Sequence, residues 1–156
     1  MKKIFSIIVA SLMMVCMTAC STEIDKECGK IADAMVADNV EEVATLTDAV
    51  YAKMANCESR NLADLSLAYN YLANKSTDNT TRLDYIKKVI ECYNAAMAKD
   101  ADNTKKCYEV AKVDMANIVK QYEDMIPQFE QLVSAEQQQA AEGSAEETTE
   151  KAAEEE

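Results

Sequence analysis

Four cysteines beyond the first twenty residues are the side chains of this chain best suited to redox or metal chemistry. They are Cys28, Cys57, Cys92 and Cys107, separated by 29, 35 and 15 residues. These separations match no paired metal-binding motif. Because the chain contains no histidine, a zinc site would need all four thiolates to converge. We therefore expect neither a metal ion nor any other cofactor.

In an exported protein the same cysteines are candidates for disulfides. If Cys92 and Cys107 lie on the two helices of a hairpin, they are offset by roughly 7 Å along the helix axes, close to the limit for bridged Cα atoms. Cys28 and Cys57 are offset by roughly 10 Å in the same geometry. Cys92 and Cys107 are therefore the candidate disulfide, and buried free thiols that act as small core residues are the alternative.

The acidic side chains give little support to catalysis. The 156-residue chain has 28 Asp and Glu against 16 Lys and Arg, but no His to act as a general base near neutral pH or to activate a Ser or Cys nucleophile. Two Gly in the whole chain leave no Gly-rich phosphate loop. We predict a protein that is not an enzyme, with a small carboxylate-dependent enzyme as a distant alternative. The formal charge of −12 also argues against binding to nucleic acid.

Three of the seven tyrosines are candidates for a partner-binding surface. Tyr51, Tyr71 and Tyr85 lie off the apolar stripes of the helices described below, and tyrosine is favoured at protein interfaces. The alternative is that these rings pack against a further layer of helices. The other four tyrosines fall on the stripes, so we expect them in the core.

The first twenty residues have the pattern of an export signal. Two lysines precede an uncharged, mostly apolar run over residues 4–17, which as a helix would reach roughly 21 Å and so fall short of a ~30 Å hydrocarbon core. The run ends in Met17-Thr18-Ala19-Cys20, which resembles the lipobox of bacterial lipoproteins, with Met17 where Leu is usual. The resemblance implies cleavage after Ala19 and attachment of acyl chains such as palmitate to Cys20. An ordinary secretory signal cut near Ala19 is the alternative.

The resemblance also implies a membrane address. Two or three acyl chains on Cys20 hold a protein on a membrane essentially permanently, since each buried methylene contributes about 0.8 kcal/mol. Ser21 is a non-Asp residue after the cysteine, which in the enterobacterial sorting pattern leads to the outer membrane. The early acidic residues Glu23, Asp25 and Glu27 are similar to those of Bacteroides-type lipoproteins displayed on the cell surface. We expect a lipid-anchored protein of the bacterial cell envelope, in the outer membrane, on its periplasmic or surface face.

The rest of the chain has the pattern of amphipathic helices. Two Gly and one Pro are too few for the turns of an all-β fold. Apolar residues recur at steps of three and four in five segments, over residues 24–36, 40–57, 62–72, 83–97 and 108–132. Asp38 with Glu41, and Asn61 with Asp64, are expected to open the second and third helices. The polar stretch 74–81 is expected to be the main loop.

The last stripe is the longest and contains the only proline of the chain. Pro127 removes a backbone hydrogen bond inside the helix, so we expect a kink near residues 123–126. Phe129 and Leu132 continue the stripe, so this part is expected to dock on the core or, alternatively, to line an apolar groove that binds a partner. From Glu136 onward no large apolar residue appears and eight acids face one lysine, which predicts a disordered acidic tail over 136–156.

One segment resembles the second helix of a tetratricopeptide repeat. Residues 89–103 have the spaced small, aromatic and small positions of that helix, with Tyr93 as the aromatic residue and Ala101 where the family usually has Pro. A similarity of apolar positions at an offset of 43 residues also suggests two related helical hairpins. The resemblance, over residues 62–103, implies a tetratricopeptide-like helical-hairpin array, and a plain bundle of about five antiparallel helices is the alternative. Both are all-α.

These observations predict a signal peptide over 1–19, an all-helical domain over 20–135 and an acidic tail over 136–156. The predicted function is non-enzymatic protein binding or scaffolding at the cell envelope. The predicted partners are the membrane, through the acyl chains on Cys20, and a second protein. A structural or stress-related envelope lipoprotein without a dedicated partner is the alternative.

Overall fold

The computed structural model describes residues 22–153, with side chains through residue 138. Over this range the chain is all-α, as predicted, and contains no strand. Its elements are α2 (Glu23–Val36), α3 (Val40–Tyr51), the short 3-10 helix η1 (Met54–Asn56), α4 (Ser59–Lys75), α5 (Asn79–Lys99), α6 (Ala101–Ala111) and α7 (Met115–Ala153). The predicted signal peptide and Cys20 lie outside the described residues.

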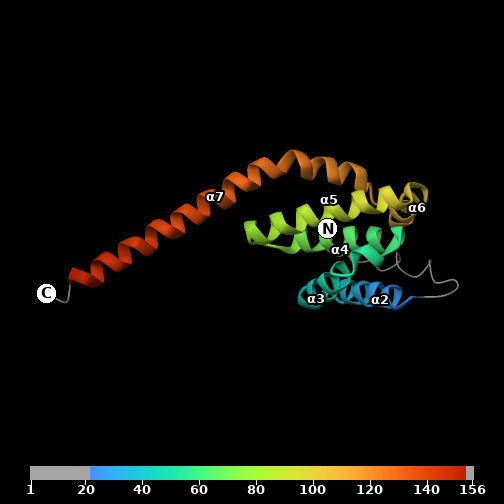
Figure 1. The fold of residues 1–156 in the computed structure, drawn as a ribbon, viewed down its shortest axis with the longest axis horizontal. Helices are drawn as coiled ribbons and strands as arrows, with labels where there is room; N and C mark the ends of the chain where they lie inside the picture. Colours follow the sequence, from blue (N-terminus) through green and yellow to red (C-terminus); the bar gives the residue numbers. More distant parts are fainter. Residues whose placement is uncertain (1–21, 154–156) are drawn as a thin grey trace.

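The helices pack antiparallel around a central pair, α4 and α5. Figure 1 shows α2 and α3 on one side of this pair and α7 on the other, with α6 near the end of α5. Residues of α4 such as Leu62, Leu65 and Tyr69 are almost fully buried, as are Ile86 and Val89 of α5. The bundle form of the all-α prediction therefore describes the fold, with six α-helices in the described range instead of five.

Side-chain caps fix where the helices begin. Thr22, Asn39, Asp78 and Asp100 each accept a hydrogen bond from the backbone N–H three residues further on. The sequence predicts Asp38 as the cap of α3, and this is wrong by one residue. Asp38 instead has a left-handed backbone with φ of 55°, which reverses the chain between α2 and α3.

The predicted opening of α4 is also displaced. Asn61 lies in the first turn of α4, as its third residue, and its Oδ1 accepts a hydrogen bond of 3.0 Å from the backbone N–H of Glu58. Glu58 is therefore the N-cap and the helix begins at Ser59. Asn61 acts as the third residue of a capping box, whose side chain accepts the backbone N–H of the N-cap residue, and not as the N-cap itself. The loop predicted over 74–81 is shorter than expected, since only residues 76–78 separate α4 from α5.

The longest predicted stripe, over 108–132, belongs to two helices. Lys112 takes a left-handed φ of 52° and ends α6, and Asp114 Oδ1 accepts a 3.1 Å hydrogen bond from the N–H of Asn117 at the start of α7. Tyr108 and Met115 remain buried on either side of the break. The prediction of one continuous helix was therefore wrong, because a change of helix direction can keep apolar residues on the core side without interrupting their spacing.

α7 bends and then extends beyond the bundle. Figure 1 shows its change of direction in the orange part of the ribbon, the range that contains Pro127, in agreement with the predicted kink. Past Glu136 the backbone stays helical to Ala153, which adds roughly 26 Å of helix, and Figure 1 shows this part leaving the other helices. The sequence predicts coil over this range. Ala, Glu and Gln are strong helix formers, so the segment can be helical although it has no apolar face to pack.

Candidate functional site

Three tyrosine rings from three helices surround the ammonium group of Lys88. Its Nζ lies 5.4 Å from the ring centroid of Tyr51 on α3, 5.2 Å from that of Tyr69 on α4 and 5.9 Å from that of Tyr85 on α5. The Tyr69 ring meets Tyr51 edge-on at 5.5 Å and Tyr85 at 6.0 Å. Ring faces attract a cation at these distances. We call Tyr51, Tyr69, Tyr85 and Lys88, with the carboxylates described next, the tyrosine–lysine cluster.

Three carboxylates complete the cluster. Lys88 Nζ lies 3.1 Å from Asp48 Oδ1 and 3.0 Å from Asp84 Oδ2. The Tyr69 hydroxyl donates a 2.8 Å hydrogen bond to Asp48, and the Tyr51 hydroxyl donates a 2.5 Å hydrogen bond to Glu91. Partial burial lowers the pKa of Lys88, but the hydrogen bonds to Asp84 and Asp48 outweigh it, so that the pKa is raised. Three carboxylates against one lysine leave the cluster with a surplus of negative charge.

The cluster lies at the surface, with Tyr69 as its buried floor. Tyr69 has no exposed surface, whereas Tyr51 and Tyr85 are half-buried and the Asp48 and Asp84 side chains are 53% and 59% exposed. Burial raises the pKa of all three tyrosine hydroxyls, and the carboxylate bonded to Tyr51 raises that group's pKa further. These hydroxyls therefore stay protonated, and those of Tyr51 and Tyr69 act as hydrogen-bond donors. The arrangement of aromatic rings and carboxylates suits binding of a cationic group.

The third candidate tyrosine, Tyr71, does not join this cluster. Its hydroxyl donates a 2.5 Å hydrogen bond to Asp38, and Lys75 Nζ lies 5.4 Å from its ring centroid and 2.5 Å from Asp38. Tyr71 thus fastens the end of α4 to the turn between α2 and α3. The predicted surface of three tyrosines is divided into a pair at the tyrosine–lysine cluster and one residue elsewhere.

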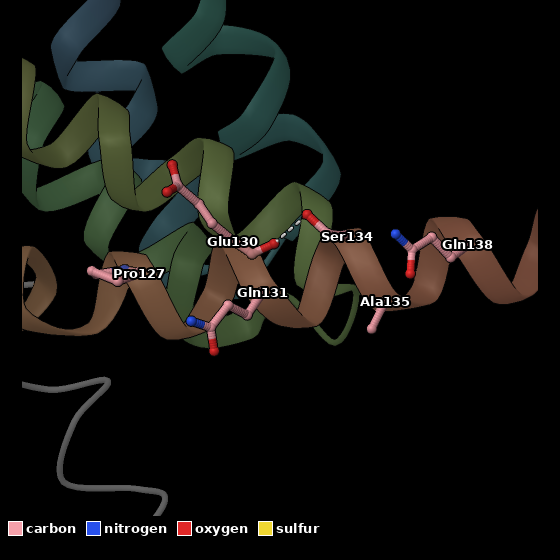
Figure 2. Close-up of a pocket in the computed structure, with 6 residues that line it drawn as sticks. All are labelled: Pro127, Glu130, Gln131, Ser134, Ala135 and Gln138. Atoms are coloured by element: carbon pink, nitrogen blue, oxygen red, sulfur yellow. Dashed lines mark hydrogen bonds between the residues drawn. The ribbon is translucent and has the colours of Figure 1, made fainter.

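Phe129 and Leu132 have different environments. Phe129 is 8% exposed and its ring lies 5.3 Å from the Arg82 guanidinium carbon on α5, whereas Leu132 is 51% exposed. A nearby surface hollow has a volume of about 460 Å³. It is lined by Pro127, Glu130, Gln131, Ser134, Ala135 and Gln138, whose side chains are drawn in Figure 2. All six of these residues belong to α7, and neither Phe129 nor Leu132 is among them. The structure therefore does not bring Phe129 and Leu132 together in an apolar groove.

The cysteines are placed as small core residues. Cys28, Cys57 and Cys92 are buried free thiols, so the predicted bridge between Cys92 and the half-buried Cys107 is not formed in this structure. Burial raises the pKa of the Cys92 thiol to about 12, and burial raises the pKa of Cys57 also. Neither thiol is a thiolate near neutral pH, the form that reactive cysteines and metal ligands require.

The described residues hold no group of three or more His, Cys, Asp or Glu side chains that could bind a metal ion. In the same range no helix is long and apolar enough to cross a membrane. Comparison with known proteins gives no relative: no family model, curated protein or solved structure matches the chain. The lipoprotein and tetratricopeptide resemblances therefore stay predictions.

Sequence reasoning found Tyr51 and Tyr85 but missed the other members of the cluster. The pattern of apolar residues places Tyr69 in the core and singles out neither Lys88 nor Asp84. A local signal does exist, since Asp84, Tyr85 and Lys88 stand at the spacing of one helical turn. Asp48 and Tyr51 of α3 have no such signal in the sequence, because their place in the cluster depends on how α3 packs against α4.

Proposed function

We propose that the protein is a lipid-anchored lipoprotein of the cell envelope that binds a second protein and catalyses no reaction. The anchor is supported by Met17-Thr18-Ala19-Cys20 at the end of a short apolar run. The binding role is supported by the tyrosine–lysine cluster. The observation that carries it is the position of two half-buried tyrosine rings beside three carboxylates, of which Asp48 and Asp84 share the ammonium group of Lys88 and Glu91 accepts the Tyr51 hydroxyl.

The chemistry of the cluster indicates a cationic partner surface. Asp48 and Asp84 share one ammonium group and keep more than half of their side-chain surface exposed. A lysine or arginine of a partner can therefore add a second ion pair without displacing Lys88. Tyr51 and Tyr85 supply rigid, amphipathic rings of the kind enriched at binding hot spots.

Mass spectrometry of the protein extracted from membranes tests the anchor. We expect acyl chains on Cys20 as the first residue of the mature chain, and an unprocessed or soluble product from Cys20→Ala. A mature chain that begins at Cys20 or Ser21 without acyl groups would overturn the anchor.

Photo-crosslinking in cells tests the binding role. A photoreactive phenylalanine analogue at position 85 keeps an aromatic ring in the cluster, and the same analogue at the exposed Glu109 of α6 is the matched control. We expect a discrete protein adduct at position 85 that is lost when Asp48 and Asp84 are both changed to Asn, and no such adduct at position 109. Identical adducts at both positions, or none at either, would favour a structural envelope lipoprotein without a dedicated partner.

A further inference from the structure

We propose that the bundle stands on the membrane on the end that carries Thr22, and that α7 carries its acidic C-terminal segment away from the lipid. The proposal rests on the proposed lipid anchor at Cys20. It adds which part of the bundle faces the lipid headgroups and which part faces the aqueous space.

The connection between the anchor and the bundle is very short. Thr22 is the N-cap of α2 and follows Cys20 by two residues. Two residues span at most ~7 Å in any conformation. Acyl chains on Cys20 lie in the bilayer, so the first turn of α2 is held close to the headgroup layer.

This connection cannot be lengthened at low cost, because the first turn of α2 is bonded to α4. The Thr22 backbone N–H donates a 2.8 Å hydrogen bond to Asp25. Asp25 in turn pairs with Arg60 at 2.5 Å and accepts a 2.8 Å hydrogen bond from Asn61, and its side chain is only 11% exposed. Unwinding the first turn of α2 would leave Arg60 and Asn61 without this partner. The anchor is therefore attached to the bundle as a whole.

The same end of the bundle includes parts of four other helices. Lys53, just after α3, pairs with Glu27 of α2 at 2.8 Å. Asn103 of α6 donates a 3.0 Å hydrogen bond to Ser59 at the start of α4, and Lys99 at the end of α5 donates to the carbonyl of Cys57. We call the end formed by residues 22–27, 53–61 and 99–103 the tether end.

α7 runs from the tether end toward the opposite end. Its contacts with α5 show this direction: Glu130 pairs with Lys87 at 2.9 Å, and Glu136 accepts a 2.6 Å hydrogen bond from Asn79, the first residue of α5. Asn79 lies about 30 Å along α5 from Lys99 of the tether end. With the further ~26 Å of helix to Ala153, the end of α7 lies about 55 Å from the tether end. Figure 1 shows this arrangement.

The alternative orientation, with the bundle lying on its side, is less compatible with the acidic side chains of α3 and α5 and with the position of α7. The side formed by α3 and α5 carries Asp48, Asp84 and Glu91, which an anionic lipid surface repels. The side formed by α2 faces away from α7. If the bundle lay on α2, α7 would therefore still be the helix farthest from the lipid. End-on standing leaves the tyrosine–lysine cluster accessible, since Lys88 lies about 16 Å along α5 from Lys99.

Energy transfer from single tryptophans to dansyl-labelled lipid headgroups tests the orientation. The chain contains no Trp, so each introduced Trp is a unique donor. Four exposed positions serve: Asp102 at the tether end, Val36 at the far end of α2, Thr77 between α4 and α5, and Gln137 on α7. Each lipidated variant is reconstituted into phosphatidylcholine vesicles that contain the dansyl lipid. We expect strong transfer for Asp102→Trp and its loss for Thr77→Trp and Gln137→Trp, with Val36→Trp well below Asp102→Trp.

The acyl mass of each reconstituted sample separates failure of the anchor from failure of the orientation. A chain without acyl groups overturns both the proposed function and this proposal. An acylated chain with strong transfer at position 36 shows a bundle lying on α2, and strong transfer at position 77 or 137 shows an inverted or flat bundle. Either result overturns the orientation alone. Circular dichroism of the four variants verifies that each keeps the helical content of the wild type.

Discussion

Replacing Phe129 by Ala tests whether the part of α7 beyond Pro127 belongs to the core. Phe129 is 8% exposed and contacts α5, where the Arg82 guanidinium carbon lies 5.3 Å from its ring centroid. Truncating a buried Phe to Ala costs about 3–5 kcal/mol, and losing its cation–π contact with the half-buried Arg82 costs about 1 kcal/mol. The site is near the end of the bundle, where α7 can relax into the space left behind. We therefore expect a loss of about 3 kcal/mol in the free energy of unfolding and a fall in Tm of about 10 °C.

Leu132→Ala is the matched control on the same helix. Leu132 is 51% exposed, so its truncation removes about half of the burial of a core Leu and should cost about 1 kcal/mol or less. Urea unfolding followed by circular dichroism, with thermal melting as a second measurement, compares the two variants. Equal losses, or a loss below about 1 kcal/mol for Phe129→Ala, would refute the argument that this part of α7 docks on the core.

Three further predictions use the same unfolding assay. Burial raises the pKa of Asp64 to about 7, so its ionisation destabilises the fold as the pH rises from about 4 through 7. Asp64→Asn should therefore add up to about 4 kcal/mol to the free energy of unfolding at pH 8 but almost none at pH 4. An unchanged dependence of stability on pH in this variant would contradict the argument. Lys88→Met should cost about 1–2 kcal/mol, while Lys87→Met, which breaks a pair half-exposed on both sides, should cost less than about 0.5 kcal/mol. Truncation after Gln138 should change stability by less than about 0.5 kcal/mol, and a larger loss would show that the removed helix docks on the bundle.

The helices were predictable because their apolar stripes are long and regular. Steps of three and four place Ile31 and Met35 on one face of α2, and Ile86 and Val89 on one face of α5, and all four are buried. The ends were less predictable, because Asp38 and Asn39 are equally good capping residues in isolation. Only the left-handed φ of Asp38, set by the turn between α2 and α3, decides that Asn39 caps α3.

The break between α6 and α7 shows a limit of periodicity. Tyr108, Ala111 and Met115 are spaced as on one helix and are all buried, yet Lys112 leaves the helical conformation between them. Both α6 and α7 pack their apolar residues against the central pair, α4 and α5. The spacing of apolar residues therefore indicates which residues are buried, but it does not indicate that they belong to one continuous helix. Asp114, followed by a new helix, was the available signal of a cap, and it is weaker than the stripe that it interrupts.

The tyrosine–lysine cluster was only half predictable for a different reason. Its rings come from α3, α4 and α5, so its formation depends on how those helices pack, which spacing along one helix cannot express. Lys88 is an ordinary residue for an exposed helix face, and only the buried ring of Tyr69 beneath it makes the position unusual. Sites built across helices leave only fragments of a pattern in each helix.

Charge and geometry act together in the proposed orientation. Residues 136–156 carry eight acids and one lysine, and an anionic lipid surface repels them only within a Debye length of about 8 Å at physiological ionic strength. The described part of this segment, residues 136–153, extends from about 30 Å to about 55 Å from the tether end, which is beyond that range, so end-on standing carries no electrostatic cost from it. Any tilt that brought α7 down to the lipid would place these acids within the range of repulsion. The short connection at Thr22 fixes which end of the bundle meets the membrane, and the charge on the last part of α7 opposes the bundle folding over onto it.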